Sequence, residues 1–509
     1  MEEQIFARFA KPEKSFSTSD KAFAFAMLGC GFLYWKLISV FMLGAGVTIF
    51  AIVMFIISFI YLSKSSAKQN AGSLILLVLA GLSAAQFVFF DNWLISGMNF
   101  IFLSAVFIYW ICLSTDHRID NKLSVYIIGD AVKQVVSMPF RNFGCCASGM
   151  KGFFTNKRVK GILPALVGIL VFLPLIAIVI RLLISADFAF EYFTNRIADF
   201  ISIGKIITNI IQFVIGIPVA FYLYGLIYGN VKGRYADKIT VDSVDEAAGV
   251  VRFAPKTAIY SVLASFIAVY FIFFVVQVAY LFAAFGGNLP AEYTYAEYAR
   301  RGFFELCAVA GINLVVLVVS ALTVKRGSGE NPTALRIETL IISLCTMLLI
   351  ATALSKMAMY ISAYGLTQLR VFTSWFMVFL FLIFALICIR QFITFNMTKY
   401  IIAGFICMFM ILSYGNVDGL IAKYNISRYE AGTLSTFDIA MIAGLSDAAV
   451  PGIYDMYLRT DENDLEMRQR LELLIMSGKS NRIIGFREFN FQRYRADEIR
   501  AIMSDTIQS

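Results

Sequence analysis

The sequence predicts an all-α fold of the multi-pass integral membrane class, because its composition and the length of its apolar runs both fit helices that cross a bilayer. Of the 509 residues, 59% are hydrophobic and 15% are charged, whereas a soluble domain has about 45–50% apolar and about 25% charged residues. The apolar residues recur in runs of roughly 20, the length that a helix needs to cross the hydrocarbon core. The alternating segments of a membrane β-barrel are not present in this pattern.

About eleven of these runs are expected to be transmembrane helices. The first two form one apolar stretch that is interrupted by Trp35 and Lys36. We interpret this stretch as two spans joined by a tight turn, with a single long tilted span as the alternative. The predicted spans are residues 22–34, 38–62, 73–90, 93–113, 162–185, 206–228, 258–282, 302–324, 339–362, 372–389 and 400–414.

Basic residues are distributed unequally between alternate connecting segments, and this inequality predicts the orientation. With the N-terminus inside, 24 Lys and Arg residues fall in the inner segments and 6 in the outer segments, as the positive-inside rule requires. Three parts follow: a cytoplasmic N-terminal segment (1–20), a transmembrane domain (21–415) with basic cytoplasmic loops at 115–161 and 230–256, and a small extracytoplasmic helical domain (416–509).

The loop at 115–161 combines basic residues with an apolar face at helical spacing. We interpret it as a helix that lies in the inner-leaflet interface and is attracted to anionic lipid; a docking surface for a cytoplasmic partner is the alternative. The adjacent Cys145 and Cys146 fit small packing residues, with lipidation as a further alternative. The apolar face consists of Val125, Ile128, Val132, Val135, Val136 and Phe140.

Polar residues near the outer ends of the later spans are the candidate functional residues. A tyrosine-rich polar island covers residues 285–305, and on a helix Glu297, Arg301 and Glu305 would share one face at i, i+4 and i+8. Glu305 and Lys356 lie within predicted spans, where an ionisable side chain is a functional hypothesis by default. The candidate intramembrane or outer-face polar site therefore consists of Glu297, Arg300, Arg301, Glu305, Lys356, Tyr360, Tyr364 and Arg370.

Three interpretations of this polar site remain open. Glu305 and Lys356 could form an ion pair that holds two helices together, or could extend to the interface. They could instead form a substrate or proton site that opens to the outside, or Glu305 could be a catalytic carboxylate. The tyrosines also fit the aromatic belt at a membrane interface.

The residue inventory predicts no catalytic residues, no metal site and no cofactor. His117 is the only histidine, which excludes a His-rich metal site and disfavours a His-based triad. The net charge of +9 is assigned to the basic cytoplasmic loops and not to nucleic-acid binding. The expected partners are the lipid bilayer, anionic lipid at the basic loops and an envelope protein.

Several motifs together resemble a bacterial polytopic membrane family that is catalogued as a domain of unknown function. The first is Phe285-Gly-Gly-Asn-Leu-Pro followed by Tyr295-Ala-Glu-Tyr-Ala-Arg-Arg-Gly-Phe-Phe-Glu305, and the second is Ala363-Tyr-Gly-Leu-Thr-Gln-Leu-Arg370 followed by Trp375-Phe-Met. The resemblance implies a multi-pass inner-membrane protein of the bacterial cell with an extracytoplasmic helical tail, and it implies no activity. Lys356 departs from the arginine expected in the family.

Three functions fit these observations. A transporter-like protein that handles a solute, a lipid or an envelope precursor fits the many spans and the intramembrane charges best. The first alternative is an envelope sensor or scaffold with an outward-facing helical domain that binds a partner. The second alternative is a membrane-embedded enzyme that acts on lipid or cell-wall intermediates.

Overall fold

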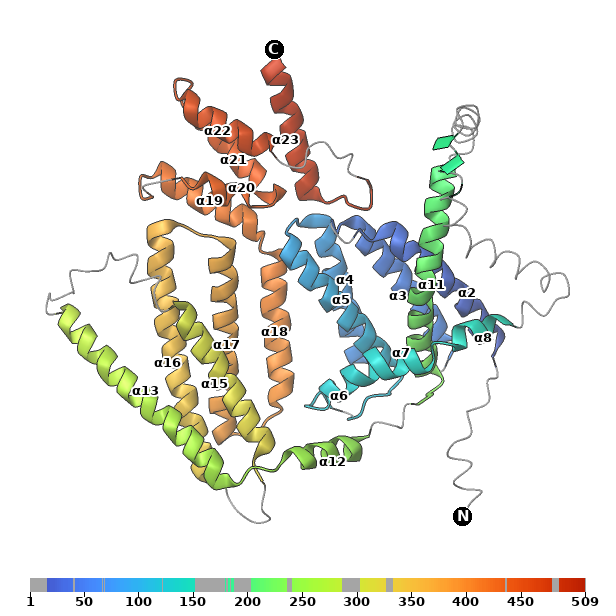
Figure 1. The fold of residues 1–509 in the computed structure, drawn as a ribbon, viewed down its shortest axis with the longest axis horizontal. Helices are drawn as coiled ribbons and strands as arrows, with labels where there is room; N and C mark the ends of the chain where they lie inside the picture. Colours follow the sequence, from blue (N-terminus) through green and yellow to red (C-terminus); the bar gives the residue numbers. More distant parts are fainter. Residues whose placement is uncertain are drawn as a thin grey trace.

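The computed structural model shows two groups of long helices side by side, with a smaller helical part at one end (Figure 1). It describes residues 16–39, 42–65, 67, 69–120, 122–151, 179, 182–183, 185–186, 203–235, 240–285, 303–325, 333–434, 437–477 and 485–508. Within these ranges there is no β-strand, only an isolated bridge between Ala254 and Val324. The all-α fold class is therefore confirmed.

The long helices form two groups, which we call the first and second bundles. The first bundle contains α2 (Thr18–Leu37), α3 (Ala45–Ser63), α4 (Ala71–Phe89), α5 (Trp93–Ser114) and α11 (Ile203–Val231). The second bundle contains α13 (Lys256–Phe285), α15 (Phe303–Thr323), α16 (Thr333–Tyr364), α17 (Gln368–Phe392) and α18 (Met397–Tyr414). Each bundle has its own apolar core, because large side chains such as Trp110 in the first and Phe384 in the second are completely buried.

The multi-pass prediction agrees with these helices. Nine of the eleven predicted spans coincide with helices in the described ranges that are long and apolar enough to cross a membrane. The first predicted span is α2, a separate helix that ends before α3 begins, so the break at Trp35 and Lys36 does divide two helices; its length and composition do not place it among those nine. The span predicted at 162–185 falls almost entirely outside the described residues.

Short polar side chains fix where several helices begin. Ser17 and Asp20 form a capping box at α2, in which the Asp20 backbone N–H donates to Ser17 Oγ and the Ser17 N–H donates to the Asp20 carboxylate. Asn70, Asn92 and Thr367 accept backbone N–H groups at the starts of α4, α5 and α17. Such caps satisfy donors that have no partner within the helix.

Short helices run across the ends of the bundles on one side of the molecule, which we call the basic edge (Figure 1). They are α6 (Ile127–Val132), one π-helical turn η1 (Lys133–Ser137), α7 (Met138–Arg141), α8 (Cys145–Lys151) and α12 (Val241–Val251). The hydroxyl of Tyr126, the residue before α6, donates to Asp245 of α12 at 2.8 Å and so joins these two helices.

The opposite end carries the C-terminal helices, which we call the C-terminal edge (Figure 1). They are α19 (Val417–Glu430), α20 (Ile439–Ala443), η3 (Asp447–Ala449), α21 (Val450–Arg459), α22 (Leu465–Met476) and α23 (Phe491–Gln508). Their own apolar core includes Ile453, Leu471 and Ile475. The buried ion pair between Arg500 and Asp447, with an N–O distance of 2.5 Å, closes α23 against η3.

Buried polar contacts hold the C-terminal helices to both bundles. Asp418, which is 1% exposed, accepts hydrogen bonds from Asn92 of the first bundle at 3.0 Å and from Gln368 of the second at 2.7 Å. Arg493 on α23 forms an ion pair with Asp91, between α4 and α5. The two bundles also contact directly, since the Tyr414 hydroxyl donates to the Leu82 carbonyl at 2.6 Å.

Candidate functional site

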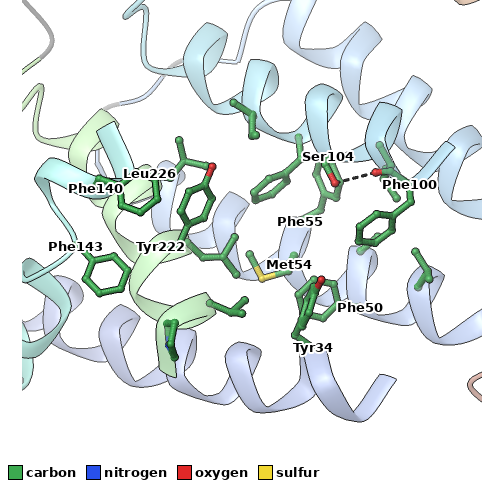
Figure 2. A pocket seen from close by; sticks show the side chains of 18 residues that line it. Tyr34, Phe50, Met54, Phe55, Phe100, Ser104, Phe140, Phe143, Tyr222 and Leu226 are labelled. Carbon is green, nitrogen blue, oxygen red and sulfur yellow. Dashed lines mark hydrogen bonds between the residues drawn. The ribbon is translucent and has the colours of Figure 1, made fainter. Parts of the chain in front are cut away.

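The most distinctive feature of the first bundle is an apolar cavity of about 580 Å³ among α2, α3, α5, α7 and α11 (Figure 2). Its size falls within the range of about 300–1,000 Å³ that is typical of small-molecule sites. Polar side-chain atoms in its wall come only from Ser104 and the hydroxyls of Tyr34 and Tyr222. The wall consists of Tyr34, Val47, Phe50, Ala51, Met54, Phe55, Phe100, Leu103, Ser104, Phe107, Ile108, Phe140, Phe143, Pro218, Val219, Tyr222, Leu223 and Leu226.

The cavity extends over about two turns of each of three long helices. Its wall covers residues 47–55 of α3, 100–108 of α5 and 218–226 of α11, and each stretch corresponds to about 12 Å of helix. Figure 2 shows Phe140 and Phe143 at one end of the row of side chains and Phe100 at the other. The helices α3, α5 and α11, which supply most of the wall, are all long and apolar enough to cross a membrane.

Close packing of α2 against α11 forms one wall of the cavity. A Cβ atom added to Gly31 would collide with the carbonyl oxygen of Gly216, so only glycine permits this approach of the two backbones. Pro218, which lines the cavity, lies inside α11 and has no N–H group to donate along the helix. On the opposite wall α5 is fixed to α4, because the Asn99 amide donates to Gln86 at 2.9 Å.

At the basic edge the cavity wall includes Phe140 of α7 and the following Phe143, beside Tyr222 and Leu226 of α11. The Tyr222 hydroxyl of α11 donates to the Val135 carbonyl of η1 at 2.9 Å. The Phe140 ring of α7 packs edge-on against Tyr222, with 5.8 Å between the ring centroids. Phe140 is nevertheless 62% exposed, so the wall is thin at this point.

A buried polar cluster joins α2, α3 and α11 between the cavity and the basic edge. The Asp20 carboxylate, 1% exposed, accepts a hydrogen bond from the Tyr61 hydroxyl at 2.7 Å and pairs with the Lys232 ammonium at 3.0 Å. It also accepts the Ser17 N–H at 2.9 Å. With these partners the buried charge is compensated, and the cluster acts as a clamp on the end of the bundle.

The segment with the predicted apolar face, residues 125–140, is not one continuous α-helix. We call it the interfacial segment. It is divided into α6, η1 and α7, yet all six residues of its predicted apolar face are exposed. Its inner side is anchored by Lys133, whose ammonium donates to the His117 carbonyl at 2.9 Å, and by Asp130, which accepts the Ile119 N–H at 2.9 Å. Burial raises the pKa of the Asp130 carboxyl, and Lys133 and Arg118 oppose this effect.

The two adjacent cysteines pack inside the protein. Cys145 and Cys146 on α8 are both buried among side chains of the first bundle. Burial raises the pKa of the Cys146 thiol to about 12, with a smaller contribution from Cys145. A buried, neutral thiol favours the packing interpretation over lipidation.

Of the candidate polar residues at the outer end, Glu297, Arg300 and Arg301 lie outside the described residues. Glu305 lies in the first turn of α15 and is exposed, and Lys356 on α16 is half-buried. The Glu305 carboxylate is near enough to attract the Lys356 ammonium electrostatically.

Tyr360, Tyr364 and Arg370 are brought together at the turn between α16 and α17. The Arg370 guanidinium lies 4.1 Å from the centroid of the Tyr360 ring and donates to the backbone carbonyls of Tyr364, at 3.1 Å, and Gly365. The Tyr360 and Tyr364 rings are in edge-on contact, with centroids 5.1 Å apart. Gly365 has a φ of +77°, a conformation that glycine adopts without strain. The cluster closes the turn that joins the two helices.

Residues 22–456 match a family described as Domain of unknown function (DUF4153). The chain belongs to this family. No curated protein and no solved structure matches the chain. The resemblance drawn from the sequence motifs is therefore confirmed at the level of the family, and DUF4153 membership brings no assigned activity.

In this DUF4153 protein, the cavity is a feature that the sequence did not reveal. Most of its wall residues are ordinary apolar residues of the predicted spans, and only Phe140 belongs to a surface that the sequence indicates. The Asp20–Lys232 pair was also missed, although the Ser17–Asp20 capping box is recognisable in the sequence. In the described part of the chain, no group of three or more His, Cys, Asp or Glu side chains could hold a metal ion.

Proposed function

We propose that the protein is a transporter-like membrane protein that handles a lipid, whose acyl chain occupies the cavity of the first bundle. The apolar cavity between candidate membrane spans supports this proposal. An acyl chain that leaves the bilayer for this cavity exchanges one apolar environment for another, so its entry leaves no polar group without a partner. A polar solute would find few hydrogen-bond partners among these side chains and would lose its hydration without compensation.

The proposal includes the orientation and the compartment expected from the sequence. The basic edge faces the cytoplasm, and the C-terminal helices face the outside of the bacterial inner membrane. The distribution of Lys and Arg supports this arrangement, and so does the position of the C-terminal helices at the end of the molecule opposite α6, α7 and α12 (Figure 1). Anionic lipid at the basic edge belongs to the same proposal.

An envelope sensor or scaffold is the second candidate function. The observation that favours it is the buried contact of Asp418 with both bundles, because a partner bound to the C-terminal helices would act on both bundles through it. We assign the Arg370 cluster to closure of the α16–α17 turn and Glu305 with Lys356 to helix anchoring. A membrane-embedded enzyme remains the third candidate, and no contact among the described residues favours it.

The decisive experiment fills the cavity and measures bound lipid. Ser104 lines the cavity on α5, and its hydroxyl bonds only within its own helix, to the Phe100 carbonyl. We expect Ser104→Trp to abolish the lipid that co-purifies with wild-type protein in mild detergent, as measured by native mass spectrometry. Ile101→Trp is the matched control, since Ile101 is on the same helix, 70% exposed and outside the cavity wall.

The same variants test transport. In reconstituted vesicles, wild-type protein and Ile101→Trp should move a fluorescent phospholipid between leaflets faster than protein-free vesicles, and Ser104→Trp should not. Wild-type protein that retains no lipid, or a Ser104→Trp variant that retains as much as wild type, would overturn the lipid proposal.

A further inference from the structure

The end of the cavity at the basic edge offers a route for lipid from the adjacent leaflet. The spans supply most of the cavity wall, but α7 and the start of its neighbouring loop supply Phe140 and Phe143. Phe140 thus belongs to two surfaces at once: it lines the cavity, and it is exposed on the apolar face of the interfacial segment. A path along this face therefore leads into the cavity past one aromatic ring.

The apolar face continues the path outward from that ring. Val125, Ile128, Val132 and Val136 are exposed at helical spacing along α6 and η1. A row of exposed aliphatic side chains at the ends of membrane spans is stable when it is buried among acyl chains at the interface. Arg141 follows Phe140 directly and is exposed, as expected for a segment that lies beside anionic head groups.

One hydrogen bond lies at the inner end of this path. The Val135 carbonyl of η1 accepts a hydrogen bond from the Tyr222 hydroxyl of α11, and the Phe140 ring packs on the same tyrosine. The residue four positions after Val135 is Pro139, which has no N–H to donate to this carbonyl along the helix. Tyr222 therefore connects the interfacial segment to the cavity wall through both its hydroxyl and its ring.

We propose that Phe140 and Tyr222 form a portal through which the acyl chain of an anionic phospholipid in the leaflet at the basic edge reaches the cavity. This inference rests on the proposed function and adds the substrate class and the leaflet of origin. The lipid approaches along the apolar face of α6, η1 and α7, and separation of η1 from Tyr222 admits its chain.

The test follows the time course of lipid uptake by the full-length protein. The protein is reconstituted in vesicles of phosphatidylethanolamine and phosphatidylglycerol, and phosphatidylglycerol with a diazirine at the end of one acyl chain is then added. Light flashes at successive times crosslink the chain, and mass spectrometry quantifies adducts on the peptide that contains Met54, which lies in the cavity wall. The rate of adduct formation and the final amount of adduct are recorded separately.

Three variants separate the portal from the cavity. Tyr222→Phe removes one neutral hydrogen bond and keeps the ring, so uptake should become about fivefold faster. Phe140→Trp enlarges an exposed ring at the portal and should slow uptake. Val132→Trp is the matched control, because Val132 is exposed on the same face but does not line the cavity; it should leave the rate unchanged.

The outcomes distinguish the two proposals. No adduct on the Met54 peptide in wild-type protein would overturn the proposed function itself. If adducts form in wild-type protein, but at the same rate in wild type, Tyr222→Phe and Phe140→Trp, the portal alone is overturned. The portal would also be overturned if Val132→Trp slows uptake as much as Phe140→Trp does. The effect would then belong to the whole apolar face of α6, η1 and α7. The same diazirine probe with a choline head group tests whether the lipid must be anionic. Equal uptake of the choline and glycerol probes would contradict that part of the proposal.

Discussion

Asp418 is a buried carboxylate whose three hydrogen-bond donors come from different parts of the chain. Asn92 begins α5, Gln368 begins α17, and the Ser446 N–H, 3.1 Å from the carboxylate, precedes η3. Ser446 occupies the N-cap position of η3, but its side chain makes no capping bond. Its backbone instead supports the buried acid.

We expect Asp418→Ala to destabilise the protein by about 3 kcal/mol or more, because it leaves several buried donors without a partner. Asp418→Asn should cost less, since its amide oxygen can still accept two of them. Asp455→Ala is the control, because Asp455 is exposed and its loss should change stability by less than about 0.5 kcal/mol. Chemical unfolding in detergent gives the three values, and a wild-type value for Asp418→Ala would contradict this account.

For single residues, the sequence indicates which charged side chains are unusual better than it indicates which residues they contact. Lys356 and Glu305 were recognisable as costly intramembrane charges, and the structure brings them within electrostatic reach. Asp418 and Asp20 were not singled out, although both are buried. One partner of each lies hundreds of residues away in the chain, Lys232 for Asp20 and Asn92 for Asp418, so no local spacing could have revealed these two contacts.

Among the helices, the contact between α2 and α11 shows how a small residue shapes the cavity. The two glycines, Gly31 and Gly216, allow the backbones to touch, and the cavity wall continues on both helices through Tyr34 and Pro218. Helices in lipid associate by close packing, because the surrounding chains are as apolar as the helices themselves. Separation of this pair would therefore alter both stability and the shape of the cavity.

Gly31→Ala should destabilise the protein by about 1–3 kcal/mol, because the new methyl group collides with the Gly216 backbone. Gly29→Ala is a matched control on the same helix, since a Cβ atom there meets nothing within 4 Å and alanine favours the helix. Thermal unfolding in detergent measures both variants. If Gly31→Ala and Gly29→Ala behave alike, the glycine contact does not determine how closely α2 and α11 pack.

The helices themselves were largely predictable, and the physical reason is the length that a bilayer imposes. Hydropathy located nine spans because each must be apolar over about 20 residues. The interfacial segment was recognised by its face, but its division at η1 was not, since a π-helical turn has no comparable sequence pattern. The cavity escaped prediction because it depends on which apolar residues face one another.

On the scale of the whole molecule, the two edges differ in chemistry and in position. The basic edge carries the interfacial segment and α12, and the C-terminal edge carries a helical part that holds both bundles together (Figure 1). If lipid reaches the cavity from the leaflet at the basic edge, the orientation of the protein decides which leaflet supplies it. The proposed orientation therefore determines the direction of the proposed activity.

The orientation can be tested with one cysteine at each edge in a background that lacks the native cysteines. Leu473 on α22 and Val250 on α12 are both highly exposed, so Leu473→Cys and Val250→Cys should be accessible to reagent at their own edges. In intact bacterial cells whose outer membrane has been permeabilised, a membrane-impermeant maleimide should label Leu473→Cys and not Val250→Cys. Disruption of the inner membrane should make both reactive. Labelling of Val250→Cys alone in intact cells would reverse the orientation and would place the portal in the outer leaflet.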